Sequence, residues 1–302
     1  MLPDRSLCRF RLGDQPAHLG YIRQGQLVDL TASGDPQYAS LGDWLLAASG
    51  RAAAASAALE GAAAACQPLG AVEALLEQGL TLLAPIDRQE VWACGVTYEM
   101  SRSARMRESR EPTIYEKVYD AERPEIFFKA TPQRVVGPGE AVGIRADSTW
   151  DVPEAELTLL VTPALEIVGY TVGNDMSSRS IEGENPLYLP QAKVYDRCCA
   201  LGPVVVLAEA VDPLNLPITC RIEREGATVF SGETHTRLIH RPLAELIHYL
   251  GRCNTFAAGV LVMTGTGVVP PDTFTLREGD TISLTIGQLG TLTNPVTVLP
   301  IG

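Results

Sequence analysis

Three carboxylates are the residues of this sequence whose types and spacing could do chemistry together. Glu154 and Glu156 lie two residues apart at the start of the apolar run PEAELTLLV, and Asp175 follows in GYTVGNDMSSR. In a β-strand, residues i and i+2 point to the same face, so the two glutamates would lie about 6 to 7 Å apart along the backbone. Their mutual repulsion would become attraction around a divalent cation with oxygen ligands. The spacing predicts a hard-metal site that Asp175 could complete.

A solvated edge strand is the alternative explanation for the paired glutamates, because charges on an edge discourage pairing with other chains. The run that follows them is largely apolar, with Leu157 and Leu159 on one face and Leu160 on the face of the glutamates. The end of a strand beside a pocket fits this pattern better than an exposed edge does.

Composition limits the classes of function. The chain has 302 residues, of which 46% are hydrophobic and 20% charged, enough for a packed core and two domains. A net charge of −12 argues against nucleic-acid binding, because phosphates are neutralised by basic side chains. The basic stretch from Arg102 to Arg110 is interspersed with Glu99, Glu108 and Glu111, which favours a solvated helix face.

The sequence also predicts a cytoplasmic protein with no membrane partner. No apolar run approaches the roughly 20 residues that span a bilayer, and Asp4, Arg5 and Arg9 occupy the region where a signal peptide is apolar. The cysteines are odd in number and lack metal-type spacing, and Cys198 and Cys199 are adjacent. We expect them to be reduced and mostly buried.

The chain is expected to divide near Pro85 into a small N-terminal accessory domain, residues 1–84, and a larger domain, residues 85–302, which carries these candidate residues. The first part has strand-like pieces joined by a hairpin turn around Gly25, and then three helical patterns. These strands are expected at residues 7–12 and 18–30, and these helices at residues 41–49, 51–66 and 71–79.

The second part is rich in β-branched and aromatic runs separated by short turns. These strands are expected at residues 125–130, 156–161, 166–172, 202–208, 218–224, 227–232, 259–266 and 280–287. A helix is predicted at residues 242–250, where Leu243, Ile247 and Leu250 share one face. The polar segment SIEGENPLYLPQ, residues 180–191, is expected to be a loop that closes over the site.

Several motifs of the second part occur in one order that resembles the fumarylacetoacetate hydrolase family across roughly residues 85 to 300. The motifs are CGVTYEMS, EIFFKA, PEAELTLLV, GYTVGNDMSSR, QAKVYD, LGP, LVMTGTG and REGDTISLTI. The resemblance implies an α+β protein with a mixed β-roll catalytic domain and a small N-terminal α/β domain. It also implies that Glu154, Glu156 and Asp175 bind Mg²⁺, or Mn²⁺ in its place, in agreement with their spacing.

The same resemblance assigns the other site residues. It implies that Lys193 in QAKVYD is a buried active-site lysine and that Lys129 in EIFFKA lies near the pocket, where we expect it to bind the substrate. Thr266 and Gly265 in MTGTG are implied to hold the carboxylate of the substrate. Without the resemblance, both lysines would be interpreted as surface residues with buried stems.

One difference between this sequence and the family's hydrolases argues against hydrolysis as the activity. Its carbon–carbon hydrolases carry a water-activating histidine in the loop after the glycine and aromatic pair, but this sequence places Ser101 there, which we expect to contact the substrate. The histidines of this chain are elsewhere, and are expected to be ordinary surface or helix residues: His18, His235, His240 and His248.

The motifs CGVTYEMSRSARMRES and RPEIFFKA are similar to a subgroup of 2-keto-3-deoxy sugar acid dehydratases, which implies a catalytic Glu125 beside Lys193. The expected reaction converts a 2-keto-3-deoxypentonate to 2,5-dioxopentanoate and water. Hydrolysis of acylpyruvates or diketo acids, decarboxylation of oxaloacetate, and binding of a keto acid without turnover remain alternatives. The resemblance implies a homodimer or homotetramer with a small 2-keto acid as its partner.

Overall fold

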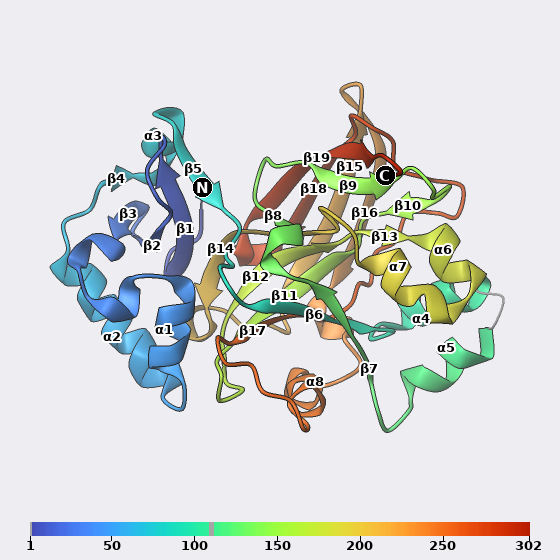
Figure 1. Cartoon of the computed structure of the whole chain (residues 1–302), viewed down its shortest axis with the longest axis horizontal. Helices are drawn as coiled ribbons and strands as arrows, with labels where there is room; N and C mark the ends of the chain where they lie inside the picture. The colour runs from blue at the N-terminus through green and yellow to red at the C-terminus, as the bar shows by residue number, and fades with distance from the viewer. Residues whose placement is uncertain (1, 109–111) are drawn as a thin grey trace.

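The computed structural model describes residues 2–108 and 112–302 and contains one large mixed sheet and one smaller sheet (Figure 1). Within the described residues the large sheet has twelve strands, with the order β4-β3-β2-β1-β14-β12-β11-β17-β6-β7, β5 beside β1 and β8 beside β14. Its strands are β1 (Ser6–Leu12), β2 (His18–Arg23), β3 (Gln26–Asp29), β4 (Gly70–Ala71), β5 (Leu80–Leu83), β6 (Glu90–Gly95), β7 (Glu125–Ala130), β8 (Val135–Val136), β11 (Ala155–Val161), β12 (Ile167–Asp175), β14 (Cys199–Leu207) and β17 (Val260–Met263).

The smaller sheet packs against the large one and closes the β-roll. In the order of the sheet its strands are β16 (Ala227–His235), β15 (Pro217–Arg224), β18 (Thr281–Ile286), β19 (Thr291–Leu299) and β9 (Val142–Arg145). A short ribbon of β10 (Asp151–Val152) and β13 (Ser177–Ser178) lies beside them. Every residue of β11 and β14 is buried, because these central strands are covered on both faces. The α+β class and the β-roll expected from the resemblance are confirmed.

Helices gather at the two ends of the large sheet and below it in the view of Figure 1. The α-helices are α1 (Leu41–Ala48), α2 (Ala52–Ala65), α3 (Val72–Glu77), α4 (Glu99–Glu108), α5 (Pro112–Tyr119), α6 (Arg179–Glu184), α7 (Leu189–Lys193) and α8 (Leu243–Leu250). The 3-10 helices are η1 (Thr31–Ser33), η2 (Pro36–Tyr38), η3 (Pro132–Arg134), η4 (Pro186–Tyr188), η5 (Ala208–Ala210), η6 (Thr236–Leu238) and η7 (Gly287–Leu289). In the described parts of the chain, no helix is long and apolar enough to cross a bilayer.

The N-terminal part continues the large sheet. Strand β1 pairs antiparallel with β14, where Ser6 lies opposite Val206 and Leu7 opposite Val205. The predicted hairpin is confirmed by β2 and β3, with Gly25 at φ +69° in the turn between them. The predicted helices α1, α2 and α3 cover this end of the sheet (Figure 1). The predicted domain boundary after residue 84 falls between β5 and β6. The division into two domains stays a prediction, because the pairing of β1 with β14 joins the two parts in one sheet.

The segment SIEGENPLYLPQ is not a loop, so this expectation is wrong. It forms all of α6 except the first residue, then η4 and the first three residues of α7. The Ser178 hydroxyl accepts a hydrogen bond from the Ile181 amide at the start of α6, and the Asn185 side chain accepts one from the Leu187 amide at the start of η4. Helices α4 to α7 lie together at the right of Figure 1, beside the ends of β7 and β13.

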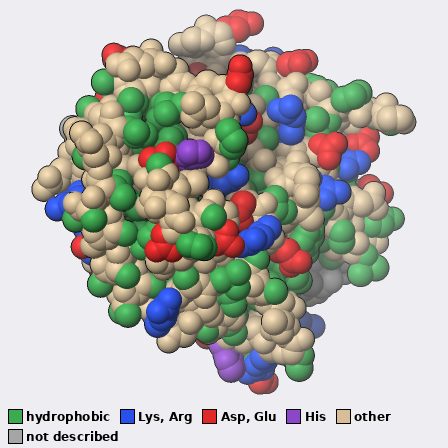
Figure 2. Space-filling view, turned by 60° about the vertical axis from the view of Figure 1, so that its left-hand side comes forward, with side chains coloured by type: hydrophobic (Ala, Val, Ile, Leu, Met, Phe, Trp, Pro, Cys, Tyr) green, Lys and Arg blue, Asp and Glu red, His purple; other side chains and the backbone are tan. Residues whose placement is uncertain are grey.

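Side chains of opposite charge are interspersed with apolar ones on the face in Figure 2. Five of the cysteines are buried, and all seven have free thiols, as expected from their number and spacing. The stretch from Arg102 to Glu108 forms most of α4, whereas Arg110 and Glu111 lie outside the described residues.

Candidate active site

Two neighbouring strands in the middle of the large sheet bring the three predicted carboxylates together. Glu154 immediately precedes β11 and Glu156 lies two residues further on, so their side chains share a face. Asp175 ends β12, and its amide donates a hydrogen bond of 3.0 Å to the carbonyl of Glu154. One carboxylate oxygen from each residue lies within 4.8 Å of the others, and all three residues are buried. Because β11 lies between β12 and β17, the edge-strand alternative is wrong.

The electrostatics of the cluster are uneven. Burial alone would raise the pKa of Glu154, but the positive charges of Lys193, Arg105 and Arg179 outweigh burial and hold that pKa well below its usual value. The pKa of Glu156 is raised well above its usual value, first by burial and then by the negative charges of Asp175 and Glu154. The side chain of Glu156 accepts a hydrogen bond of 2.6 Å from the Gly265 amide. Burial and its two acidic neighbours therefore both favour the protonated form of Glu156.

Lys193, at the end of α7, is buried among these acids. Its Nζ donates to Glu154 Oε2 at 3.0 Å, Asp175 Oδ2 at 3.0 Å and Ser177 Oγ at 2.6 Å. Burial lowers the pKa of this ammonium, but the carboxylates of Asp175 and Glu154 reverse that effect and raise the pKa above its usual value. Without a metal ion, Lys193 is therefore a positively charged partner of these two carboxylates.

Lys129, on β7, lies behind the carboxylates. Its Nζ pairs with Asp175 Oδ1 at 2.5 Å and donates to the carbonyls of Met176 at 3.0 Å and Lys193 at 2.5 Å. The side chain is fully buried and does not line the cavity in front of the carboxylates. The predicted contact of Lys129 with substrate has no support in this position, which instead fixes the orientation of Asp175.

Arg105 on α4 corrects the interpretation of the basic stretch as a solvated helix face. Its Nη2 donates to Glu154 Oε1 at 2.8 Å, and its Nη1 donates to Glu182 Oε2 at 2.6 Å. Arg179 Nη2 approaches Glu154 Oε1 at 3.0 Å. A sequence signal for Arg105 existed, because it lies one helical turn after Ser101, a residue already predicted to face the pocket. Glu182 was missed because its segment was interpreted as a loop, and Arg179, the last residue of GYTVGNDMSSR, was assigned no role.

Glu125 begins β7, directly opposite Gly95 at the end of β6. A Cβ atom on Gly95 would lie 2.1 Å from Glu125 Oε2, so only glycine leaves room for this carboxyl group. Burial raises the pKa of Glu125 to about 7, with a further increase from the negative charge of Glu182, whereas Arg105 and Lys193 lower it. Glu125 can therefore bind or release a proton near neutral pH.

The remaining predicted residues lie at the same cavity but have local partners. Thr266 Oγ1 donates to the carbonyl of Val268 at 3.0 Å. Gly265 has φ +88°, a conformation that favours glycine, and its amide faces Glu156. Ser101 Oγ accepts a hydrogen bond of 3.2 Å from the Tyr98 amide and donates one of 2.7 Å to the Tyr98 carbonyl, so this hydroxyl caps the start of α4. None of the four histidines, all within the described residues, lines this cavity.

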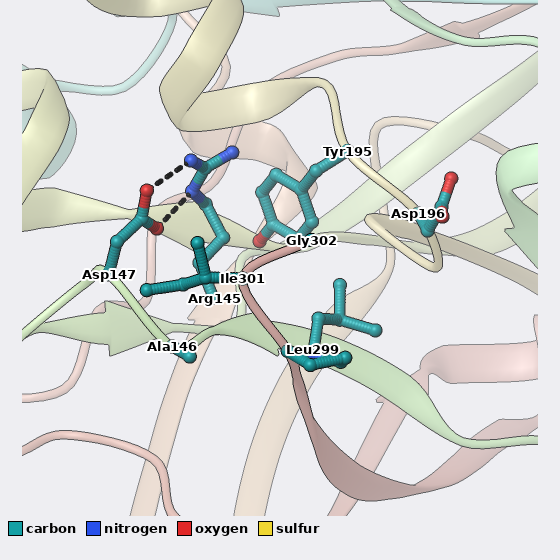
Figure 3. Close-up of a pocket in the computed structure, with 9 residues that line it drawn as sticks. Arg145, Ala146, Asp147, Tyr195, Asp196, Leu299, Ile301 and Gly302 are labelled. Atoms are coloured by element: carbon teal, nitrogen blue, oxygen red, sulfur yellow. Dashed lines mark hydrogen bonds and ion pairs between the residues drawn. The ribbon is translucent and has the colours of Figure 1, made fainter.

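These residues surround a small cavity. A larger and more open pocket lies elsewhere, between the ends of β9 and β19 and the segment after α7 (Figure 3). There Arg145 forms two hydrogen bonds with Asp147, at 2.8 and 2.6 Å, so its charged groups neutralise each other. The smaller cavity holds the carboxylate cluster and Glu125 and is therefore the candidate active site.

The donor set fits a divalent cation such as Mg²⁺. Three buried oxygen donors converge within 4.8 Å of one another, which is the ligand chemistry that hard cations require. Burial, followed by the negative charges of Asp175 and Glu154, raises the pKa of Glu156, and a bound cation would oppose both effects. Glu154, Glu156 and Asp175 would hold the ion.

The chain belongs to the fumarylacetoacetate hydrolase family. The model of the fumarylacetoacetate (FAA) hydrolase C-terminal domain matches residues 91–297, which is more than half of the chain.

Two similar proteins carry the names of sugar acid dehydratases. The chain is 55% identical over 216 residues to a probable 2-keto-3-deoxyxylonate dehydratase of Haloferax volcanii, covering 71% of this chain and 74% of that protein. It is 48% identical over 217 residues to a 2-dehydro-3-deoxy-D-arabinonate dehydratase of Saccharolobus solfataricus, covering 70% and 73%. A solved 2-keto-3-deoxy-D-arabinonate dehydratase complexed with magnesium and 2,5-dioxopentanoate superimposes with a TM-score of 0.81 at 36% identity, covering 98% of this chain and 100% of that one.

Proposed function

We propose that this chain is a Mg²⁺-dependent hydro-lyase that removes water from a 2-keto-3-deoxypentonate to give 2,5-dioxopentanoate. The observation that carries the proposal is a carboxyl group with a pKa of about 7, Glu125, in the same cavity as three converging carboxylates. Relatives at 55% and 48% identity that are named as dehydratases support this assignment.

The reaction breaks one C3–H bond and the C4–O bond. A proton then moves from C5 to C3, and the proton of the C5 hydroxyl moves to C4, which leaves the aldehyde at C5. When bound, a divalent cation supplies Lewis acidity to the carboxylate and keto oxygens of the substrate, which makes the C3 proton more acidic. Glu125 accepts that proton as a carboxylate and returns a proton to the departing C4 hydroxyl. Atoms balance, because the proton and hydroxide removed from the pentonate leave as one water molecule.

The other residues bind and orient. Lys193 keeps its positive charge among Glu154 and Asp175 and stabilises negative charge that develops on the keto oxygen. Thr266 and the turn at Gly265 receive the substrate carboxylate, and Ser101 borders the pocket without serving as a base.

Hydrolysis of acylpyruvates or diketo acids, and decarboxylation of oxaloacetate, are the competing functions because their substrates share the chelating keto acid group. A parallel assay decides between them. The protein with Mg²⁺ is given a 2-keto-3-deoxypentonate, an acylpyruvate and oxaloacetate, and release of a semialdehyde is measured beside cleavage and loss of CO₂. Turnover of the pentonate alone is the expected result, whereas turnover of only an acylpyruvate or oxaloacetate rejects the dehydratase. Binding without turnover would identify a non-catalytic keto acid receptor.

Two further expectations belong to this proposal. The free thiols of all seven cysteines fit a reducing cytoplasm. The homodimer or homotetramer implied by the family is tested by light scattering after size-exclusion chromatography, where a monomer mass would contradict it.

A further inference from the structure

Arg105 occupies a position that the proposed chemistry does not use. Arg105 lines the cavity although it belongs to α4, the first of the two helices that lie between β6 and β7 in the chain. The side chain is about nine-tenths buried, with 10% exposure. A buried guanidinium is stable only when it is paired, and here one arm holds Glu154 and the other holds Glu182.

The Glu154 carboxylate binds positively charged side chains in this structure, and it is also a predicted ligand of the metal ion. Its Oε1 accepts from Arg105, Arg179 and Ser177, while its Oε2 accepts from Lys193. A metal ion held by the same carboxylate would lie close to three positive side chains, and like charges repel in a buried site. Arg105 can release Glu154 from its Nη2 group and still remain in the cavity, because its Nη1 group stays paired with Glu182.

We propose that Arg105 is a substrate-binding residue that exchanges one anion for another. In the metal-free protein its Nη2 neutralises Glu154, and when Glu154 turns to the metal ion the same arm donates to the carboxylate of the incoming 2-keto acid. This inference rests on the proposed function and names a further residue of that site. Guanidinium and carboxylate match in geometry, and the 2-keto acid brings a negative charge that takes the place of Glu154 at this one arm, while the other arm keeps Glu182.

The exchange predicts effects of opposite sign on two ligands. Removing the guanidinium charge removes a competitor for Glu154, so Mg²⁺ should bind roughly tenfold more tightly in the absence of substrate. The same change removes a donor for the keto acid, so pyruvate should bind at least roughly tenfold more weakly to the Mg²⁺-loaded protein. A residue that merely supports the fold would weaken both.

Calorimetry on the full chain tests this. Mg²⁺ is titrated first into metal-free protein, and pyruvate, which carries only the keto acid head group, is then titrated at saturating Mg²⁺. The variant is Arg105→Gln, and the matched control is Arg107→Gln, which removes the same charge from the exposed side of the same helix. Arg105→Lys keeps the positive charge but loses the two-pronged guanidinium group. This variant should bind Mg²⁺ as the wild type does, and its affinity for pyruvate should lie between those of the wild type and Arg105→Gln.

The outcomes separate the two proposals. A wild-type protein that binds no Mg²⁺ overturns the proposed function itself. If the wild type binds both ligands, the inference is overturned by an Arg105→Gln protein that loses affinity for both or binds pyruvate normally. Should that variant fail to fold, wild-type affinity for pyruvate in Arg105→Lys overturns the inference instead.

Discussion

Glu125 is the residue whose replacement separates proton transfer from binding. Glu125→Gln keeps the shape of the side chain and its place opposite Gly95 but cannot exchange a proton at neutral pH. We expect kcat to fall roughly 10²- to 10⁴-fold, while Mg²⁺ and pyruvate bind as in the wild type. Steady-state kinetics with calorimetry measures both, and a large rise in KM at unchanged kcat would assign Glu125 to binding instead.

The same substitution should stabilise the metal-free protein in a pH-dependent way. The folded-state pKa of Glu125 is about 7 against an ordinary value of 4.5, so the folded state retains a proton between these pH values that the unfolded chain releases. The wild type therefore loses stability as pH rises from about 4.5 to 7. Glu125→Gln lacks this loss and should be more stable by about 3 kcal/mol at pH 8, and equal near pH 4.5. Urea unfolding in chelator at both pH values tests this, and equal stability at pH 8 would contradict it.

Glu156 tests the metal site with little disturbance of its neighbours. Its carboxylate is repelled by Asp175 and Glu154 and is held by the Gly265 amide. Glu156→Gln should preserve the fold and the melting temperature in chelator, because glutamine can accept the same hydrogen bond. Saturating Mg²⁺ should raise the melting temperature of the wild type, since a ligand that binds only the folded state stabilises it. The variant should show little of this shift, and a full shift would exclude Glu156 as a ligand.

At the scale of the element, the pairing of β6 with β7 controls where Glu125 lies. Gly95→Ala would place a methyl group 2.1 Å from Glu125 Oε2 and force the carboxyl group aside. We expect a large loss of kcat with normal Mg²⁺ binding, because the ligands lie on other strands. Gly61→Ala is the matched control, since nothing lies within 4 Å of that position, and it should be active and about 1 kcal/mol more stable. Wild-type kcat in Gly95→Ala would show that Glu125 tolerates displacement.

Long elements could be predicted from sequence because their patterns repeat several times. The alternation around Glu154 and Glu156 gave both the strand and the shared face, and the helical spacing of Leu243, Ile247 and Leu250 gave α8. Helices α6 and α7 have six and five residues, which is too short for a 3.6-residue period to show, and they depend on caps and tertiary contacts.

The burial of Arg105 could not be predicted from the pattern of charged residues, for a different reason. Its neighbours Arg102 and Arg107 do face solvent, so the stretch as a whole has the composition of an exposed helix. The spacing of one helical turn from Ser101 distinguishes Arg105 in the sequence, but its partners Glu154 and Glu182 are supplied by distant segments. The three carboxylates were predictable because two of them are close in sequence, whereas the cations around them converge from separate elements.

At the scale of the whole molecule, the continuous sheet argues that the two predicted domains fold together. Strand β1 pairs with β14, and a single hydrophobic core extends from Leu7 to Val296. Residues 85–302 alone would expose the edge of β14 and the apolar residues that β1 covers, and such an edge promotes aggregation. We expect the truncated chain to be insoluble or to lack a cooperative transition, while the full chain unfolds in one step by calorimetry. A soluble 85–302 fragment with its own sharp transition and Mg²⁺ binding would instead establish the N-terminal part as an independent domain.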